Sequence, residues 1–431
     1  MLTRFSQIAD NLMYHKTILE NGVRIVSEAS DHLRSISVGI WVDAGSRDEL
    51  EGENGIFHFI EHMTFKGTRN RSCLEIAKEL DALGGLSNAF TSKENTCFHA
   101  RVLDKHFGVL ADVLSDVFLN SIFSPDDVER ERQVILQEIS MVEDTPDDNI
   151  HVLFNRFFWM DHPLGMPTLG TGGTVSGIGR EIILNYLSTY YIPERILIAA
   201  SGNMDHQSIV SSFKPLFERL KGNNSNTKRS APSSHAGTAI HFKDLEQIHI
   251  CLGGEAPPVS DDKRYACAIL NTILGGNMSS RLFQEIREKR GLAYSVYSFL
   301  SSYLDTGLLG VYVATDSQNV NPVLETVRRE IRKLKMGKLP ESELAAAKDH
   351  LIGVIYLASE NADSRMMRLA KNEFNFERYV SYDELTSKLE RVTVDEVVEV
   401  ASEIFRDDKV ALATLGPLKE EDLDRGNLQF S

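Results

Sequence analysis

The chain has 431 residues, and 62 acidic against 46 basic side chains give it a formal net charge of −16. A hydrophobic content of 42%, a mean hydropathy of −0.20 and the lack of any long apolar run predict a globular protein with no membrane span. The acidic balance argues against nucleic acid as a partner and is compatible with a basic or neutral peptide. Because the chain is too long for one ordinary core, we expect two or more domains.

The amino-terminal residues and the cysteines bear on the compartment. Residues Met1 to Met13 contain one Arg and one Asp and lack the apolar region of a secretory signal. We therefore expect a cytoplasmic location, with a short organellar presequence as the open alternative. The four cysteines are widely spaced and form no C-x-x-C pair, which argues against a thiol zinc site and against a disulfide scaffold.

Residues 58–62 read His-Phe-Ile-Glu-His. On a helix, His58 and His62 would lie one turn apart on one face, with Glu61 on the flank of that face. Two such imidazoles are a usual seat for zinc, and a neighbouring carboxylate can take a proton from water at the metal. The order is the inverse of His-Glu-x-x-His and is typical of a class of zinc hydrolases. The alternative is a pair of solvated histidines, but the apolar flanks favour a buried helix whose histidines need partners.

Two further segments of the first half are informative. Residues Gly84 to Thr91 predict a turn that leads into a strand, which taken alone is an ordinary hairpin arm. A long helix is predicted after Pro125, where Glu131 and Glu138 are seven residues apart and so share one face. Zinc needs a third protein ligand, and these two glutamates form a shortlist for it. On composition alone, either is as readily a solvated charge.

The chain divides near its middle. The segment from Lys221 to Gly237 is rich in Gly, Asn and Ser, so we predict domains at 1–220 and 238–431 joined by a linker at 221–237. Both halves contain a helix opened by proline, a later helix followed by an apolar strand that ends in glycine, and strands such as SISVGIWVDAG and GLLGVYVAT. The strands predict half-buried antiparallel sheet, and the fold class is therefore α+β.

The repeated order of these markers predicts a duplicated α+β unit, with two unrelated α+β domains as the alternative. A shift of 215 residues places Glu131 on Ala346 and Glu138 on Gly353. The second half has no His-x-x-Glu-His. We therefore expect the metal site in the first half only.

Four blocks together resemble the pitrilysin (insulinase) family of zinc peptidases, in the branch of the mitochondrial processing peptidase and its bacterial relatives: GIFHFIEHMTFKGT, GGLSNAFTSKENT, ERERQVILQEI and GGNMSSRLFQEIREKRGLAYSVYS. They occur in the family's order and span nearly the whole chain. The resemblance implies two homologous α/β-sandwich halves, each an antiparallel-rich sheet packed with helices. It also implies one Zn²⁺ per chain, held by His58, His62 and Glu138, with Glu131 as an accessory glutamate and Glu61 as the general base on zinc-bound water.

The resemblance also implies how substrate is held. Asn88, Ala89 and Phe90 would belong to an edge strand to which a peptide adds by β-augmentation. Arg287 and Tyr294, seven residues apart in the second half, would contact substrate near the scissile bond. An acidic cluster follows Glu138 and consists of Glu143, Asp144, Asp147 and Asp148. In the processing peptidases, acids in this vicinity recognise arginine of the substrate, and the alternative here is a solvated loop. The loop at 275–277 lacks any phosphate-binding motif.

The predicted function is a zinc endopeptidase that cleaves peptides or unfolded, presequence-like segments. The alternatives are a non-catalytic assembly subunit of the same fold and an unrelated zinc protein that shares only the five-residue motif. Family analogy further implies a homodimer or pairing with a paralogue.

Overall fold

The computed structural model describes residues 13–222 and 228–430, so residues 223–227 of the predicted linker lie outside the described part. The chain forms two compact units. Unit 1 comprises the described residues of Met1–Ser140, Met166–Arg229 and Tyr356–Asp383, and unit 2 those of Met141–Gly165, Ser230–Ile355 and Glu384–Ser431. Each unit thus includes one segment from the other half of the sequence. The predicted division into 1–220 and 238–431 is sequential and has no such exchanged segments.

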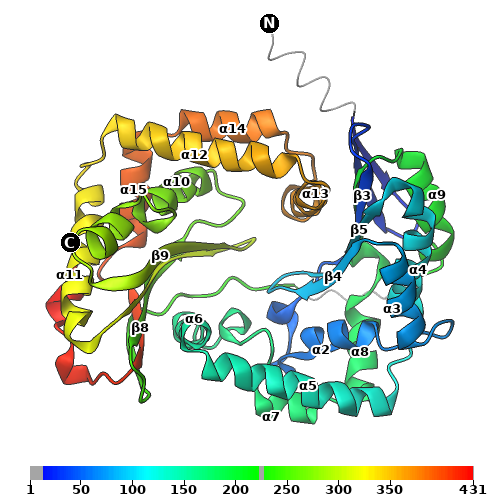
Figure 1. Ribbon diagram of the computed structural model, residues 1–431, viewed down its shortest axis with the longest axis horizontal. Coiled ribbons are helices and arrows are strands. Elements are labelled where there is room, and N and C mark those ends of the chain that lie inside the picture. The colour runs from blue at the N-terminus through cyan, green and yellow to red at the C-terminus, as the bar shows by residue number, and fades with distance from the viewer. Residues whose placement is uncertain (1–12, 223–227, 431) are drawn as a thin grey trace, which may run out of the picture. The chain divides into compact units, whose positions relative to one another are not determined.

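Unit 1 contains a six-stranded sheet, called sheet 1, with the order β1-β2-β6-β3-β5-β4. Its strands are β1 (Tyr14–Ile18), β2 (Arg24–Ala29), β3 (Ser35–Val42), β4 (Leu86–Thr91), β5 (Thr96–Leu103) and β6 (Ile196–Gly202). The pair β2 and β6 is parallel, and all the other neighbours are antiparallel. β4 therefore lies at one edge of the sheet, with β5 as its partner (Figure 1).

Unit 2 contains a five-stranded sheet with the order β7-β11-β8-β10-β9. Its strands are β7 (Gly237–Phe242), β8 (Ile248–Ala256), β9 (Ala293–Ser302), β10 (Gly307–Thr315) and β11 (Ala411–Gly416). Here β7 and β11 are parallel and the remaining pairs are antiparallel. This is the order of sheet 1 without β1, which is what the predicted duplication requires, and the predicted fold class is confirmed.

The helices of the first half are α2 (Ile56–Thr64), α3 (Cys73–Ala82), α4 (Phe107–Asn120), α5 (Pro125–Asp144), α6 (Pro146–Phe158), α7 (Gly172–Gly177), α8 (Arg180–Tyr190) and α9 (His206–Phe217). Those of the second half are α10 (Lys263–Gly275), the π-helix η6 (Phe283–Glu288), α11 (Val320–Lys335), α12 (Glu341–Ser359), α13 (Ala362–Phe376), α14 (Tyr382–Arg391) and α15 (Val394–Ile404). The helix predicted after Pro125 is α5, whose first turn is capped by the Ser124 hydroxyl bonded to the Asp127 N–H at 3.2 Å.

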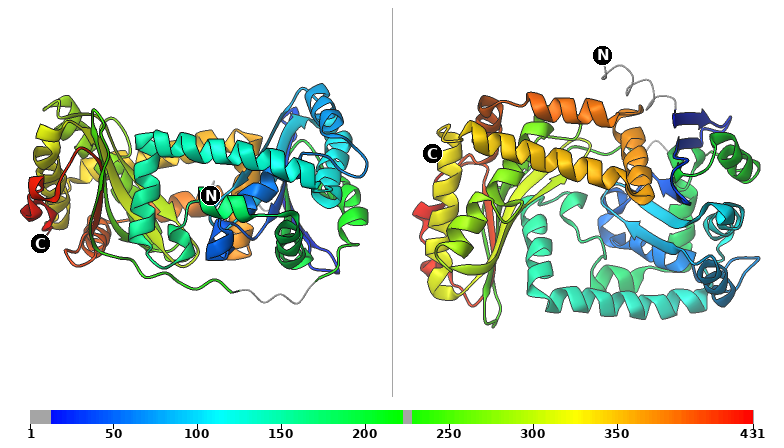
Figure 2. Two further views of the ribbon diagram at one scale, coloured as in Figure 1. Left: turned by 90° about the horizontal axis from the view of Figure 1, so that it is seen from below. Right: turned by 45° about the horizontal axis from the view of Figure 1, so that its top comes forward.

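Both faces of each sheet are covered by helices. In unit 1, α4 and α9 pack on one face and α13 packs on the other, against β2, β3 and β6 (Figure 2). The Trp41 indole N–H donates to Met366 Sδ at 3.4 Å, and the Ser37 hydroxyl donates to Asp363 at 2.6 Å. In unit 2, α10, α11 and α15 cover one face, while α6 covers the other against β8 and β11. The covering helices α13 and α6 are the segments contributed by the opposite half.

The central strands are therefore more deeply buried than their sequences predict. We expected half-buried sheets, but all nine residues of β10 and seven of the eight residues of β3 are buried. The prediction was wrong because an alternating strand shows only that one face is apolar. The second face is covered by a helix encoded more than a hundred residues away, and small residues on that face, such as Ser37 and Gly39, make room for it.

None of the helices between residues 13 and 222 or between 228 and 430 combines the length and the apolar character that crossing a lipid bilayer requires.

Candidate metal centre

The predicted motif lies on α2, a short helix that is apolar on most of its surface. Seven of its nine residues are buried, among them Phe57, Phe59 and Ile60, which join a core cluster with α5 and α8. His58 and His62 share one face of this helix, and their ring centroids lie 4.6 Å apart. The spacing of the two histidines therefore produces the shared face that the sequence predicts.

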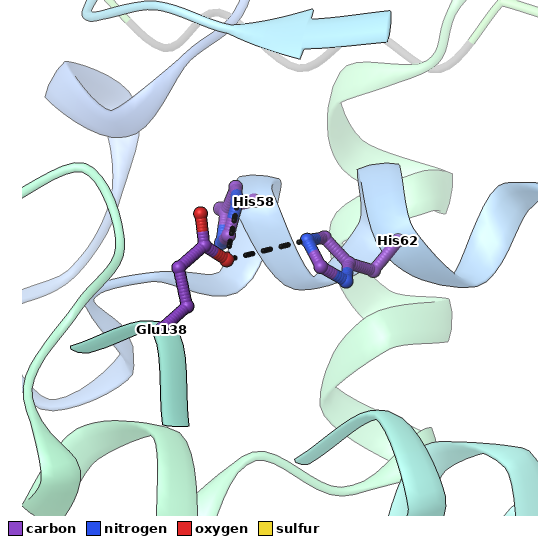
Figure 3. Close-up of side chains that lie close together, drawn as sticks. All are labelled: His58, His62 and Glu138. Carbon is purple, nitrogen blue, oxygen red and sulfur yellow. Dashed lines mark ion pairs between the residues drawn. The ribbon is translucent and has the colours of Figure 1, made fainter. Parts of the chain in front are cut away.

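The structure brings His58, His62 and Glu138 together (Figure 3). Glu138 lies on α5, and its Oε2 is 3.7 Å from Nε2 of His58 and 3.6 Å from Nε2 of His62. Within the part of the chain that the structure describes, this is the only group of three or more His, Cys, Asp or Glu side chains arranged to hold a metal ion. The three donor residues lie on two helices, and all three belong to unit 1.

The spacing and the chemistry of these donors fit zinc. A tetrahedral ion about 2.1 Å from each of three donors holds those donors about 3.4 Å apart, close to the observed separations. Burial and then the neighbouring His62 lower the pKa of His58 to about 3, so its ring is neutral near pH 7 and keeps a lone pair for a metal. The Nδ1 atom of His58 is buried without a hydrogen-bond partner among the described residues. Two imidazoles and one carboxylate are a ligand set that zinc favours.

Glu131 lies on α5 two helical turns before Glu138 and contacts the second histidine. Its Oε2 lies 3.2 Å from Nδ1 of His62, while its Oε1 pairs with the Lys66 ammonium at 2.6 Å. A carboxylate on Nδ1 holds the proton of the imidazole there and leaves Nε2 free to face Glu138. Glu131 is itself buried, at 7% exposure, so the ion pair with Lys66 offsets the cost of its charge. The accessory place predicted for Glu131 corresponds to this contact with His62.

Glu61 projects from the same helix and is held by the sheet. The Thr91 hydroxyl, at the end of β4, donates to Glu61 Oε2 at 2.7 Å. Burial is the largest influence on this carboxyl and raises its pKa, while the bond from Thr91 acts in the opposite direction. A carboxyl poised in this way accepts and returns a proton more readily than an exposed one.

The edge strand β4 borders the same site. A cavity of about 340 Å³ is lined by Glu61 and His62 from α2 and by Ser87, Asn88 and Ala89 from β4. The first three residues of β4 are exposed, and the Ala89 N–H donates to the Asn88 side chain at 2.9 Å. Phe90 instead packs edge-on against Trp41, with ring centroids 5.4 Å apart. Of the three predicted strand residues, Asn88 and Ala89 line the cavity and Phe90 faces the α13 side.

Arg287 and Tyr294 belong to unit 2. Arg287 lies on η6, and Tyr294 is the second residue of β9, with 78% of its surface exposed. The guanidinium carbon of Arg287 is 4.5 Å from the centre of the Tyr294 ring, which is a cation–π contact. The structure thus brings this predicted pair together. The predicted acidic cluster also lies in unit 2, with Asp147 and Asp148 in the first turn of α6.

Three residues at the centre were not singled out in the sequence. Lys66 lies just beyond the end of α2 at Thr64, and its contact is with Glu131 on α5, so no local pattern marked it. Thr91 lies within the predicted strand, but its contact with Glu61 depends on how β4 passes α2. Glu49 accepts hydrogen bonds from the N–H groups of Gly55 and Phe57 at the start of α2, and no local pattern indicates that contact.

Known protein families resemble both halves of this chain. Residues 24–172 match the family model described as insulinase (peptidase family M16), and residues 177–351 match the one described as peptidase M16 inactive domain. A protein of Bacillus subtilis named uncharacterized zinc protease YmxG is 38% identical over 94% of this chain and 98% of its own length. A protein of Streptomyces coelicolor that is also named an uncharacterized zinc protease is 39% identical over 95% of this chain and 91% of its own.

Solved structures share the fold. A protease from Helicobacter pylori has a TM-score of 0.88 at 23% identity and covers 94% of this chain and 99% of its own. A structure from Pseudomonas fluorescens described as a peptidase M16 inactive domain has a TM-score of 0.86 at 18% identity, with 94% and 98% covered. With two family models along its length and relatives near 38% identity over almost all of it, this chain belongs to the insulinase, or M16, family of peptidases.

Proposed function

We propose that this chain is a zinc-dependent endopeptidase that cleaves peptides or unfolded, presequence-like segments of proteins. The observation that carries the proposal is the meeting of His58 Nε2, His62 Nε2 and Glu138 Oε2 beside the Glu61 carboxyl. Relatives named zinc proteases, similar over almost the whole chain, support the same conclusion. A single donor group among the described residues supports one zinc ion per chain.

The residues of the centre divide the chemistry among them. Zn²⁺ held by His58, His62 and Glu138 would supply a Lewis acid that lowers the pKa of water and polarises the scissile carbonyl. Glu61 takes the proton from the attacking water as the new C–O bond forms, and it delivers that proton to the amide nitrogen as the C–N bond breaks. Because Thr91 engages Oε2, we assign the proton to Oε1 of Glu61.

The substrate backbone is held along β4. An extended peptide that adds to this edge bonds through its main chain, so the site accepts many side chains and selects flexible segments. The edge position of β4 and its place in the wall of the cavity with Glu61 support this assignment. We assign Arg287 and Tyr294 to contacts with the substrate carbonyl, for which a guanidinium and a phenol are both suitable donors. We also propose that two chains, or this chain and a paralogue, pair in solution, which gel filtration with light scattering tests.

The decisive experiment separates metal binding from catalysis. Glu61→Gln is expected to retain one zinc per chain by elemental analysis and to lose nearly all hydrolysis of an unstructured peptide. Full activity in this variant would refute the role of Glu61.

A second pair of variants tests the third ligand. Glu138→Gln is expected to lower bound zinc, because a neutral amide is a poor ligand for this ion. Glu129→Gln is the matched control, since Glu129 lies on the same helix with a side chain that is 65% exposed. Equal zinc content in the two variants would remove Glu138 from the ligand set.

A further inference from the structure

The helix that carries the motif begins without a capping side chain of its own. Its N-cap residue is Gly55, whose φ of 96° lies in the left-handed region. A Cβ at this position would also approach the Leu169 carbonyl oxygen to 2.6 Å, so glycine is required for both reasons. Glycine offers no oxygen to the free N–H groups of the first turn, and in a buried helix those groups need an acceptor from elsewhere.

Glu49 supplies that acceptor from a preceding turn of the chain. Its Oε2 accepts the Gly55 N–H at 2.8 Å and the Asn54 side-chain amide at 2.8 Å. Its Oε1 accepts the Phe57 N–H at 2.9 Å. A negative charge at this end of a helix is also favourable to the helix dipole. The carboxylate thus binds two N–H groups at the start of the helix, those of Gly55 and Phe57, and Phe57 directly precedes His58.

The carboxylate is held in a buried position. Glu49 is 5% exposed, and burial raises its pKa to about 7, against the hydrogen bonds from Gly55 and Phe57 that lower it. The Lys93 ammonium, which donates to the Met166 carbonyl, further favours the ionised carboxylate. Asn54 ties the arrangement to the segment that precedes α7 by a second bond to the Pro167 carbonyl at 3.0 Å. A buried carboxylate with this many donors is a built feature of the protein interior, not a surface charge.

We propose that Glu49 is the positioning residue of the metal centre: it fixes the first turn of α2 and so aims the His58 imidazole at Glu138. The inference rests on the proposed function. α2 has nine residues, and His58 is the third, inside the turn that Glu49 holds. His62 lies one turn further on and has its own support from Glu131. Loss of the Glu49 hydrogen bonds therefore displaces mainly His58, and a displacement near 1 Å is large for a metal ligand.

The test measures zinc affinity with zinc alone, in competition with a chromogenic chelator. Glu49→Gln keeps the shape of the side chain but replaces one acceptor oxygen by a donor, and we expect its zinc affinity to fall by about ten-fold or more. Glu51→Gln, an exposed glutamate two residues along, is the matched control and should bind zinc as the wild type does. Activity of Glu49→Gln should recover in part at saturating zinc with KM unchanged, because Glu61 and β4 remain in place.

The outcomes distinguish the positioning role of Glu49 from the proposed zinc-dependent activity. A folded Glu49→Gln protein with wild-type zinc affinity overturns the positioning role, even if its melting temperature is lower. A wild-type chain that binds no zinc overturns both this role and the proposed function. If Glu49→Gln does not fold, Asn54→Ser keeps the Glu49 carboxylate and removes the amide that bonds both Oε2 and the Pro167 carbonyl. Its zinc affinity should fall two- to five-fold, and unchanged affinity in that variant equally overturns the inference.

Discussion

Unit 1 and unit 2 share a strand order but differ in the side chains that lie between two of their helices, α2 and α5 in unit 1 and α10 and α12 in unit 2. In unit 1, α2 and α5 bring together two imidazoles and a carboxylate. In unit 2, α10 and α12 line a cavity of about 640 Å³ whose wall contains Glu343, Asp349 and His350. There the Glu343 carboxylate is engaged by the Arg281 guanidinium through contacts of 2.8 and 2.6 Å. Among the described residues, the shared strand order therefore brings a group of potential metal ligands together in unit 1 only.

The largest effect is expected from matched histidine substitutions in the two units. His58→Ala should abolish most zinc binding, because two donors hold zinc far more weakly than three. His350→Ala, in the cavity of unit 2, should leave zinc content at one per chain. Elemental analysis of the two purified proteins measures both. Loss of zinc in His350→Ala would break the contrast between the units.

Glu131→Ala copies into α5 the residue that occupies the equivalent place in α12, where a shift of 215 residues leads to Ala346. The variant removes the carboxylate from Nδ1 of His62, and loss of such a partner lowers metal affinity by about 10- to 100-fold. Competition with a zinc chelator measures the change. An affinity within two-fold of wild type would show that the contact with His62 does not tune the centre.

Thr91→Val removes the hydroxyl that donates to Glu61 and conserves the shape of the side chain. We expect kcat to fall by about ten-fold, since a hydrogen bond to an ionisable group is worth on the order of 1.4 kcal/mol. Zinc content should not change, because Thr91 touches none of the three donors. A decrease in zinc together with activity would instead indicate that β4 supports the whole of α2.

Ala89→Pro tests whether substrate adds to the edge of sheet 1. The Ser92 N–H bonds to the Asn95 carbonyl at 2.8 Å, so by the alternation of an antiparallel pair the Ala89 N–H points away from β5. Proline at this position therefore removes a donor from the free edge and leaves the ladder to β5 intact. We expect KM for an unstructured peptide to rise by about five-fold, the value of one net hydrogen bond. Zinc content serves as the internal control. An unchanged KM would place the substrate elsewhere.

Much of this centre could be predicted because its main parts are local. The spacing of His58 and His62 determines their common face, and α2 is a helix as expected. The third ligand was harder, since Glu131 and Glu138 share one face of α5 and residue patterns left both open. The structure shows why they are alike in sequence. Both approach His62, one at Nδ1 and the other at Nε2, and only the resemblance to a family assigned their roles in advance.

Other features depend on segments that meet only after folding. The carboxylate of Glu49 reaches the start of α2 because the chain turns back between them, and no periodicity marks that reversal. The burial of β3 on both faces depends on α13, which comes from the opposite half of the sequence. Hydrophobic alternation describes one strand at a time and contains no information about a covering helix so far along the chain.

α6 and α13 each cover the sheet formed by the opposite half of the sequence, and this exchange determines when each sheet can be completed during synthesis. Every candidate metal ligand has been synthesised once residue 138 has been added, yet one face of sheet 1 has no helix to cover it until α13 follows, at residues 362–376. The nascent first half must therefore wait, with apolar strands such as β6 uncovered on that side, for the second half to be translated. It also follows that fragments produced separately from each half would be incomplete alone and would have to complement one another to regain either sheet's full covering.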